Sequence, residues 1–233
     1  MFVMNEPAIV IKDCLIIADL HIGLAKEIYD AGIQIPSQTE KFARKLNALR
    51  KRTKAKKLVI LGDMKHRVLG LSFLEKREIQ KFLSLVEFPH IIIVKGNHDG
   101  FIEKAILPEM KSRVSIRKSL VIGGCMLTHG HRKIKSSKRT TIIGHNHPKI
   151  KFVDDLGAIY IEPVWIRGRL KDGKKIIIMP AFNDLSGSMV VNDPKFSDKE
   201  HRGFMGPIAK DIIKESARVY LLDGTYLGYL KDL

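Results

Sequence analysis

The chain has 233 residues, of which 45% are apolar and 28% charged, a composition typical of a globular protein. Its formal net charge is +16, which favours anionic partners such as nucleic acid, nucleotides or acidic lipid. A lysine-rich solvated surface produces the same charge, so the charge is only supporting evidence. The length permits one large domain or two small ones, and because no repeat or low-complexity linker divides the chain, we expect a single domain over residues 1–233.

The two cysteines, Cys14 and Cys125, lie in apolar stretches without Cys-x-x-Cys spacing. We expect buried thiols in a reducing compartment. The N-terminal residues have no basic stretch followed by an apolar one, so no signal peptide is predicted. No apolar run approaches the length of a membrane span. The prediction is a cytoplasmic protein without a membrane partner.

The first half of the chain predicts alternating strands and helices. Residues 8–18 read as two short strands, the second ending in polar residues. Ser37 predicts the start of a helix that runs to about Arg52, with Glu40 completing a capping box. The remaining predicted elements are a buried strand at 56–63, a helix at 72–86, a strand from residue 90 and a short helix at 100–107.

The second half predicts mostly antiparallel strands. Its expected strands lie at 113–117, 119–122, 125–128, 140–143, 149–153, 159–166 and 174–179. Residues 217–230 predict a hairpin with Asp223-Gly224 at the turn. Two sheets packed face to face, with helices outside, are the simplest packing of these elements.

Polar clusters follow three consecutive strands of the first half. They are Asp19-Leu20-His21, Gly62-Asp63 and Gly96-Asn97-His98-Asp99. In an open α/β sheet the carboxyl ends of parallel strands share one edge, where ligands bind. These groups are therefore expected to converge, although Asp19, Asp63 and Asn97 are separated by 44 and 34 residues.

Two strand ends of the second half carry imidazoles, in His129-Gly130-His131 and His145-Asn146-His147. Six of the nine histidines thus lie in four short polar segments, each behind an apolar strand. A single histidine of this kind is ordinarily a hydrogen-bonded core or turn residue, and we interpret His90 and His201 in that way.

The chemistry of the set is oxygen and imidazole nitrogen without thiolate. It suits Mn²⁺ first, with Fe, Zn²⁺, Co²⁺ or Ni²⁺ as alternatives, better than Ca²⁺ or a soft metal. One tetrahedral ion cannot use so many ligands. Two divalent ions about 3.5–4 Å apart that share a carboxylate would use them all. Asp63, alone behind its glycine, is the natural bridge.

In this order the five motifs resemble those of the calcineurin-like metallophosphoesterases. The resemblance implies an α/β (α+β) fold, a four-layer αββα sandwich of two mixed sheets with a dinuclear metal site at the strand ends. The segments ADLHIGLAKE, Gly-Asp-Met-Lys-His, VWIRGRL and MPAFNDLSG are similar to one branch, the phosphoesterases found alongside DNA ligases and large helicases, and their archaeal relatives. That similarity implies a helicase or ligase partner.

The resemblance also implies residue roles. The first ion would be held by Asp19, His21 and His147, the second by Asn97, His129 and His145, with Asp63 bridging. His98 would be the general acid and Asp99 its orienting partner. The expected substrate contacts are His131, Arg132, Lys133 and His66. His66 stands where the widespread motif has an acidic residue, so it either lines the site or supports it.

These roles have a physical basis. A phosphodiester resists attack because its oxygens repel nucleophiles, and two cations neutralise that charge and convert a bridging water to hydroxide near neutral pH. His98 would protonate the leaving alkoxide, so that it does not depart with a full negative charge. Such general acid catalysis raises the rate by about 10²–10⁴-fold. Asn97 would supply a neutral oxygen, which leaves the second ion more electrophilic than a carboxylate would. Gly96 and Gly100 are expected to let the backbone turn tightly.

Basic stretches suggest the substrate. Residues 44–57 carry eight basic residues, which suit the end of a helix. Residues 131–140 carry five and leave the fourth motif directly, so they are expected to rim the site. Further candidates are the basic group Arg167, Arg169 and Lys171, and two aromatic residues, Trp165 and Phe182, which either stack on bases or, as strand aromatics usually do, pack in the core.

Three functions remain open from the sequence. The first is a phosphodiesterase or nuclease acting on nucleic acid, such as single-stranded DNA. The second is an enzyme for a small diester or nucleotide. The third is a non-catalytic binding protein stabilised by its metals, against which the intact His98-Asp99 pair argues. Residues 179–207 have no clear period and could be a lid, a partner surface or a structural wrap.

Overall fold

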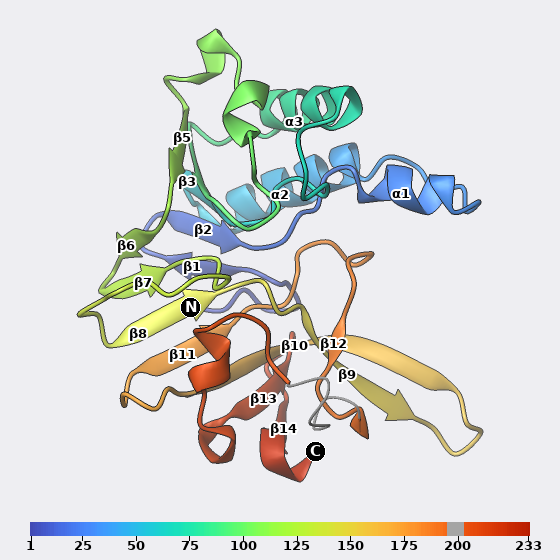
Figure 1. Ribbon diagram of the computed structural model, residues 1–233, viewed down its shortest axis with the longest axis vertical. Helices are drawn as coiled ribbons and strands as arrows, with labels where there is room; N and C mark the ends of the chain where they lie inside the picture. The colour runs from blue at the N-terminus through green and yellow to red at the C-terminus, as the bar shows by residue number, and fades with distance from the viewer. Residues whose placement is uncertain (195–202) are drawn as a thin grey trace.

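Two β-sheets packed face to face form the centre of the computed structural model, which describes residues 1–194 and 203–233 (Figure 1). The first sheet has the order β1-β2-β3-β4-β5. Its strands are β1 (Ile9–Ile11), β2 (Cys14–Ile17), β3 (Lys57–Leu61), β4 (His90–Val94) and β5 (Val114–Arg117). Strands β2 to β5 are parallel, and β1 is antiparallel to β2.

Helices cover the outer face of this first sheet (Figure 1). They are α2 (Thr39–Thr53) and α3 (Phe73–Leu85), with the 3₁₀ helices η1 (Ile102–Ala105) and η2 (Pro108–Met110). The short helix α1 (Leu24–Asp30) projects to the side of them (Figure 1). In α2, Phe42, Leu46 and Leu49 recur at helical spacing and pack into one cluster with the apolar side chains of β2 and β3. The sequence reasoning missed α1, whereas the short helix expected at 100–107 is present as the 3₁₀ helix η1.

The second sheet is mixed, with the order β12-β9-β10-β11-β8-β7-β6 and a hairpin of β13 and β14 added at β10. Its strands are β6 (Leu120–Ile122), β7 (Cys125–Leu127), β8 (Thr140–Ile143), β9 (Pro148–Val153), β10 (Ile159–Arg169), β11 (Lys175–Ile178), β12 (Met189–Val190), β13 (Arg218–Leu221) and β14 (Tyr226–Tyr229). All strands predicted for this half are present. The expected antiparallel pairing is only partial, because β7, β8 and β11 are parallel neighbours.

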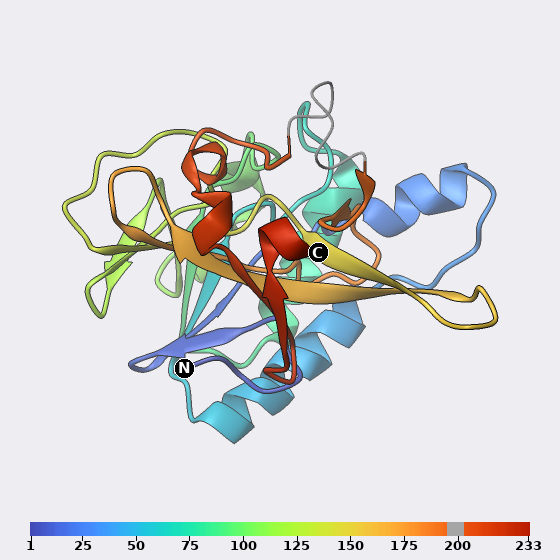
Figure 2. The same ribbon diagram turned by 90° about the horizontal axis from the view of Figure 1, so that it is seen from below.

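The outer face of the second sheet is covered by short 3₁₀ helices in place of α-helices. They are η3 (Ala209–Asp211), η4 (Lys214–Ser216) and η5 (Leu230–Asp232). Phe204, Ile208 and Ile212 close the core on this side. The sandwich therefore has the predicted layers, with a thin fourth one. The hairpin between β9 and β10 extends beyond the body of the molecule (Figure 2).

Two aromatic side chains considered for base stacking are core residues. Trp165 is 2% exposed and packs edge-on against Phe2 between the sheets. Phe182 is 1% exposed and belongs to the core beneath α2. The packing alternative is thus confirmed for both. Cys14 is buried as expected, which raises its thiol pKa to about 11, whereas Cys125 is only half-buried. Within the described ranges, no helix is long and apolar enough to cross a membrane.

The capping box predicted at Ser37 is wrong. Helix α2 begins at Thr39 behind Gln38, which makes no side-chain cap, and the Ser37 hydroxyl donates to Glu78 Oε2 of α3 at 2.7 Å. The capping box lies instead on α3, where Ser72 Oγ accepts from Glu75 N and the Glu75 carboxylate accepts from Ser72 N. Ser37 has a partner from another helix, which the local pattern could not reveal.

The core position Leu46 gives a test of this packing. Leu46 is fully buried between α2 and the first sheet, so Leu46→Ala should lower the free energy of unfolding by about 2–5 kcal/mol. Leu69→Ala, at a position 84% exposed, should change it by less than about 0.5 kcal/mol. Urea unfolding of the two variants measures both, and equal losses would contradict the assigned core.

Candidate metal centre

The carboxylate of Asp63 lies at the centre of the polar edge formed by the strand ends. Its Oδ2 is 3.1 Å from His129 Nε2, 3.8 Å from His98 Nε2 and 4.0 Å from His21 Nε2. Its Oδ1 accepts a hydrogen bond from the backbone N–H of His98 at 2.9 Å. Three imidazoles from three separate loops therefore face one buried carboxylate.

A first group of donor atoms lies on one side of Asp63 and comprises Asp19, His21 and His147. Their ligand atoms lie within 4.8 Å of one another. His147 Nε2 is 3.4 Å from Asp19 Oδ1 and 3.4 Å from His21 Nε2. Asp19 is fully buried, so its carboxylate has no access to bulk water.

A second group comprises Asp63, His129 and His145, whose ligand atoms also lie within 4.8 Å of one another. Asn97 Oδ1 joins it at 3.1 Å from His129 Nε2. The structure thus brings together all seven residues predicted as ligands, in two groups on either side of Asp63. Strands β2, β3 and β4 supply one half and β7 and β8 the other, because both sets of parallel strands end at this edge.

The hydrogen bonds of two histidines test whether cations fit here. His129 Nδ1 lies 3.0 Å from the carbonyl of Leu61, and His147 Nδ1 lies 2.9 Å from that of Gly187. A carbonyl only accepts, so each Nδ1 carries the proton, and in the neutral ring the Nε2 lone pair faces the site. There it meets further acceptor atoms, Asp63 Oδ2 for His129 and Asp19 Oδ1 for His147. Converging acceptors of nitrogen and oxygen type suit divalent cations.

The pKa values reflect this crowding. Burial disfavours charge on His129, but the hydrogen bond to Asp63 and its charge outweigh burial and raise the His129 pKa to about 9. Burial by itself would raise the pKa of the Asp63 carboxyl. The hydrogen bond from His129 and the charge of His129 outweigh burial and hold this pKa well below its usual range. Burial lowers the pKa of His21 to about 3 and, with the charge of His129, that of His145 to about 4. At neutral pH Asp63 is ionised, and His21 and His145 have free lone pairs.

The backbone is strained at the same positions. Among the described residues, nine non-glycine residues have positive φ, and five of them are predicted ligands: Asp19 (58°), His21 (46°), Asp63 (50°), His145 (70°) and His147 (43°). The left-handed region costs an L-residue about 1–2 kcal/mol. Such strain persists where the surrounding structure holds it, and it is concentrated at functional sites.

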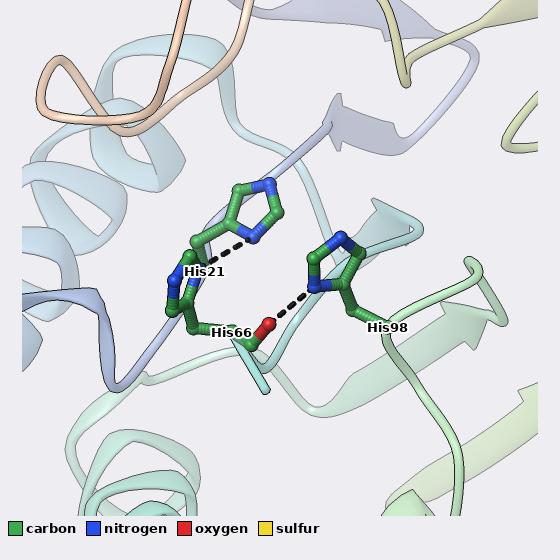
Figure 3. Close-up of side chains that lie close together, drawn as sticks. All are labelled: His21, His66 and His98. Atoms are coloured by element: carbon green, nitrogen blue, oxygen red, sulfur yellow. Dashed lines mark hydrogen bonds between the residues drawn. The ribbon is translucent and has the colours of Figure 1, made fainter. Parts of the chain in front are cut away.

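His98 and His66 lie side by side on the wall of the site, next to His21 (Figure 3). His98 Nδ1 contacts the carbonyl oxygen of His66, which leaves Nε2 facing Asp63. His66 Nε2 is 2.8 Å from Glu27 Oε2 of α1, and its Nδ1 is 3.4 Å from His21 Nδ1. His66 therefore both borders the site and supports His98 through its backbone.

The sequence predicted that Asp99 orients His98 directly. In the structure the Asp99 carboxylate accepts from backbone N–H groups instead. Its Oδ1 accepts from the backbone N–H groups of Met64 at 2.9 Å and Lys65 at 3.3 Å, and its Oδ2 accepts from Gly96 at 2.8 Å. Burial and the charge of Asp63 raise the pKa of this carboxyl. Asp99 thus ties the loop after β3 to the loop after β4, and its effect on His98 passes through the backbone.

Comparison with known proteins identifies the family. The family model for calcineurin-like phosphoesterases matches residues 14–205. The chain belongs to the calcineurin-like phosphoesterase family. It is a metal-dependent hydrolase of phosphoesters, and the two groups of donor atoms are able to bind the divalent cations that this family uses.

One solved structure shows the same fold. The crystal structure of the nuclease MPE from Pseudomonas putida is 20% identical, with a TM-score of 0.59 over 93% of this chain and 88% of that chain. A protein of unknown function from Aquifex aeolicus is 19% identical, with a TM-score of 0.37 over 57% of this chain and 78% of that one, too low a similarity to support an argument. No curated protein sequence matches significantly.

A cavity of about 620 Å³ opens beside the phosphoesterase centre, next to His21, His66, His98 and His147. The sequence reasoning missed much of its wall, which includes Leu24, Asn146, Ser186, Met189 and Met205. The last three come from the segment 179–207, whose role was open, and Gly187 of that segment accepts from His147. Residues 195–202, and with them His201, lie outside the described residues. The segment MPAFNDLSG (179–187), already similar to one branch of the family, was the sequence signal that could have placed this wall at the site.

The predicted substrate contacts of the phosphoesterase lie at the rim. His131 is half-buried with its ring 5.3 Å from that of His129, and its Nε2 accepts from Arg132 Nε at 2.7 Å. Arg132 and Lys133 are exposed, and Lys133 is 3.5 Å from Asp211 Oδ2. No described residue bonds the buried His131 Nδ1, which leaves it available to a ligand.

Glycines lie directly behind the phosphoesterase ligands. A Cβ at Gly96 would lie 2.1 Å from Asp63 Oδ1, and one at Gly62 would lie 2.2 Å from His129 Nδ1. Gly96 and Gly100 were expected to permit a tight turn, but neither has positive φ. The close approach of the Asp63 carboxylate explains why residue 96 is a glycine. A Cβ at Gly100 would meet only Val68 O, at 3.7 Å.

We expect Gly96→Ala to displace Asp63 and weaken metal binding by about 10–100-fold, the range found when the support of a metal ligand is lost. Gly100→Ala, in the same loop, is the matched control and should bind metal normally. Metal titration followed by calorimetry measures both affinities. Equal affinities in the two variants would show that Asp63 is not held in the way described.

Proposed function

We propose that this phosphoesterase is a dinuclear phosphodiesterase that cleaves nucleic acid in the cytoplasm. The observation that carries the proposal is the placing of two donor groups around Asp63, the first of which contributes His21 and His147 to the wall of an open cavity that also contains His98. A phosphate in that cavity would lie beside the first cation position and the proton donor, with Asp63 and the second group next to them. The geometry therefore suits in-line displacement at a phosphodiester.

In this proposal Asp19, His21 and His147 hold one ion, Asn97, His129 and His145 hold the other, and Asp63 is shared. When bound, the ions supply Lewis-acid neutralisation of the phosphoryl charge and lower the pKa of water. Mn²⁺ is the first expectation, with Fe, Zn²⁺, Co²⁺ or Ni²⁺ as alternatives, because carboxylate, amide and imidazole ligands accept all of them.

His98 is proposed as the proton donor to the leaving oxygen. Its Nδ1 stays bonded to the carbonyl of His66, so in the protonated ring it is the Nε2 proton that faces the substrate. Asp99 keeps the loop carrying this carbonyl beside the loop carrying His98, through its bonds to Met64, Lys65 and Gly96. The donor is thereby positioned before substrate arrives.

Charge supports nucleic acid as the substrate. The net charge is +16, and the loop leaving the centre at His131 carries Arg132, Lys133, Lys135, Lys138 and Arg139. Basic side chains that neutralise successive phosphates dominate the affinity of proteins for nucleic acid. The Pseudomonas putida protein with this fold is a nuclease, which agrees with the proposal. A helicase or ligase partner remains a prediction from the resemblance in sequence.

A second candidate is a nucleotide or another small phosphodiester. The cavity of about 620 Å³ falls within the range of small-ligand pockets, roughly 300–1,000 Å³. Leu24, Met189 and Met205 offer apolar contacts for a base. His131, Arg132 and Lys133 at the rim would bind the phosphate of either substrate.

Substituting His98 tests its role as acid. His98→Asn should lower DNA cleavage by about 10²–10⁴-fold, because the leaving alkoxide then departs unprotonated. Hydrolysis of bis(4-nitrophenyl) phosphate should fall much less, since nitrophenolate is a stable anion. Metal content should stay unchanged. Initial rates on both substrates measure the effect, and equal losses on both would argue against His98 as the donor.

Substituting Asp63 tests the shared ligand. Asp63→Asn removes the charge that both cation positions share, so metal content and hydrolysis of both substrates should fall together. Elemental analysis and rates with added Mn²⁺ measure this. Full metal content with full activity would contradict the dinuclear assignment.

The substrate class is decided by comparing single-stranded DNA, double-stranded DNA and bis(4-nitrophenyl) phosphate with Mn²⁺ supplied. Cleavage of DNA that weakens steeply with added salt is expected for a polyanion bound by basic groups. Hydrolysis of the small diester without any DNA cleavage would overturn the nucleic-acid proposal and favour the second candidate.

A further inference from the structure

A basic groove lies away from the metal centre. It is formed where strands β10, β11 and β13 meet, and Figure 1 shows these strands. It has a volume of about 410 Å³. Four basic side chains line it: Arg167, Arg169, Lys175 and Arg218. All four are exposed, and the single acidic residue among the lining residues is Glu215.

The basic residues face one another across the strands. In the register of the sheet Arg167 is directly opposite Arg218, and Arg169 is directly opposite Lys175. Like charges placed directly opposite destabilise a sheet. Among the described residues, none of the four has a carboxylate within 4.0 Å. An anion bound in the groove would relieve this repulsion.

Tyrosine rings position two of the guanidinium groups. Arg167 lies 5.5 Å from the ring centre of Tyr220, and Arg218 lies 5.4 Å from that of Tyr229. Arg218 also donates from Nη2 to the Tyr229 hydroxyl at 3.2 Å, which helps to fix its plane. The remaining N–H groups of the two guanidinium groups can donate to phosphate oxygens. Tyr220, Tyr226 and Tyr229 also form a chain of ring contacts, of which Tyr226 is 48% exposed.

The groove is too distant to share a phosphate with the metal centre. Thr140 and Lys175 of the groove begin β8 and β11, whereas His145 follows the other end of β8. At about 3.3 Å per residue, Thr140 and His145 are separated by roughly 17 Å. The basic loop 131–139 joins the two edges of the sheet, since it leaves the metal centre at His131 and enters β8 at Thr140.

We propose that this groove binds the sugar–phosphate backbone of single-stranded nucleic acid, several nucleotides from the bond being cleaved. The inference rests on the proposed function only in taking nucleic acid as the substrate. A small anion would use one pair of basic residues, whereas the two cross-strand pairs beside the half-buried rings of Tyr220 and Tyr229 suit successive phosphates and an unpaired base. The groove would hold the strand while the metal centre cuts it.

The test compares two double variants that lose equal charge. Arg169→Gln/Lys175→Gln removes two groove charges at side chains that form no hydrogen bond or ion pair with a described residue. Lys51→Gln/Lys111→Gln removes two exposed charges on the half of the molecule that carries the first sheet. The probe is fluorescent oligo(dT) of about 20 nucleotides, longer than the about 4–16 nucleotides that one small binding surface covers. Anisotropy gives the Kd at several salt concentrations.

The groove variant should bind about 5–20-fold more weakly, and its log Kd against log salt should have a slope lower by about 1.4, since each lost single-strand phosphate contact contributes about 0.7. The control should change affinity less than about 2-fold. Hydrolysis of bis(4-nitrophenyl) phosphate should be unchanged in both, which shows that the centre is intact.

The two levels of failure are distinguishable. If the unaltered protein binds and cuts oligo(dT) and the two double variants behave alike, the groove is not the binding surface, although the proposed function stands. If the unaltered protein hydrolyses the small diester but neither binds nor cuts oligo(dT), both the groove assignment and the nucleic-acid proposal are overturned.

Discussion

The convergence of acceptor atoms around Asp63 is the constraint on which the rest of the structure depends. Two buried carboxylates and several imidazole lone pairs point into one small volume, and bulk water does not reach Asp19. Such an arrangement is stable only when cations or protons compensate it. The carbonyls of Leu61 and Gly187 hold two imidazoles with Nε2 inward, so the protein commits these nitrogens to a ligand.

The surrounding structure is adapted to hold this arrangement. Left-handed backbone at the ligand positions turns side chains from strand ends back over the sheet edge. Gly62 and Gly96 let the backbone approach His129 and Asp63 more closely than any side chain would permit. Asp99 fastens the neighbouring loops together by accepting three backbone N–H groups. The strain is balanced by the burial of apolar side chains between the two sheets and beneath the helices of the first sheet.

The same two-sheet architecture separates chemistry from binding. The carboxyl ends of the parallel strands carry the metal ligands, while the opposite ends of β8 and β11 lie at the basic groove. The segment after β11 completes the cavity wall on the chemical side. The hairpin of β13 and β14 adds Arg218 and the tyrosines on the other side. Substrate positioning and hydrolysis can thus use different edges of one sheet.

Much of the fold and the grouping of the seven candidate ligands could be predicted because the relevant signals are local. Apolar strands such as 57–61 and 90–94 are short and continuous, and each polar cluster follows its strand immediately. Parallel strands of an α/β sheet generally end at one edge. The sequence alone therefore predicted that the polar clusters converge there. Residue type alone then indicated oxygen and nitrogen ligands.

Tertiary structure alone decided what depends on neighbours distant in sequence. The Ser37 hydroxyl donates to Glu78 of another helix while it accepts at 3.4 Å from Thr39 N of its own helix, and Asp99 is occupied by backbone amides of a different loop. The cross-strand pairing of Arg167 with Arg218 arises from a register between residues 51 positions apart (218 − 167). The sequence by itself determined which chemical groups the chain carries and behind which strands they lie. Their distances, tautomers and partners were decided only when the sheets packed, because hydrogen bonds and charge interactions depend on separations of a few ångströms that no local pattern specifies.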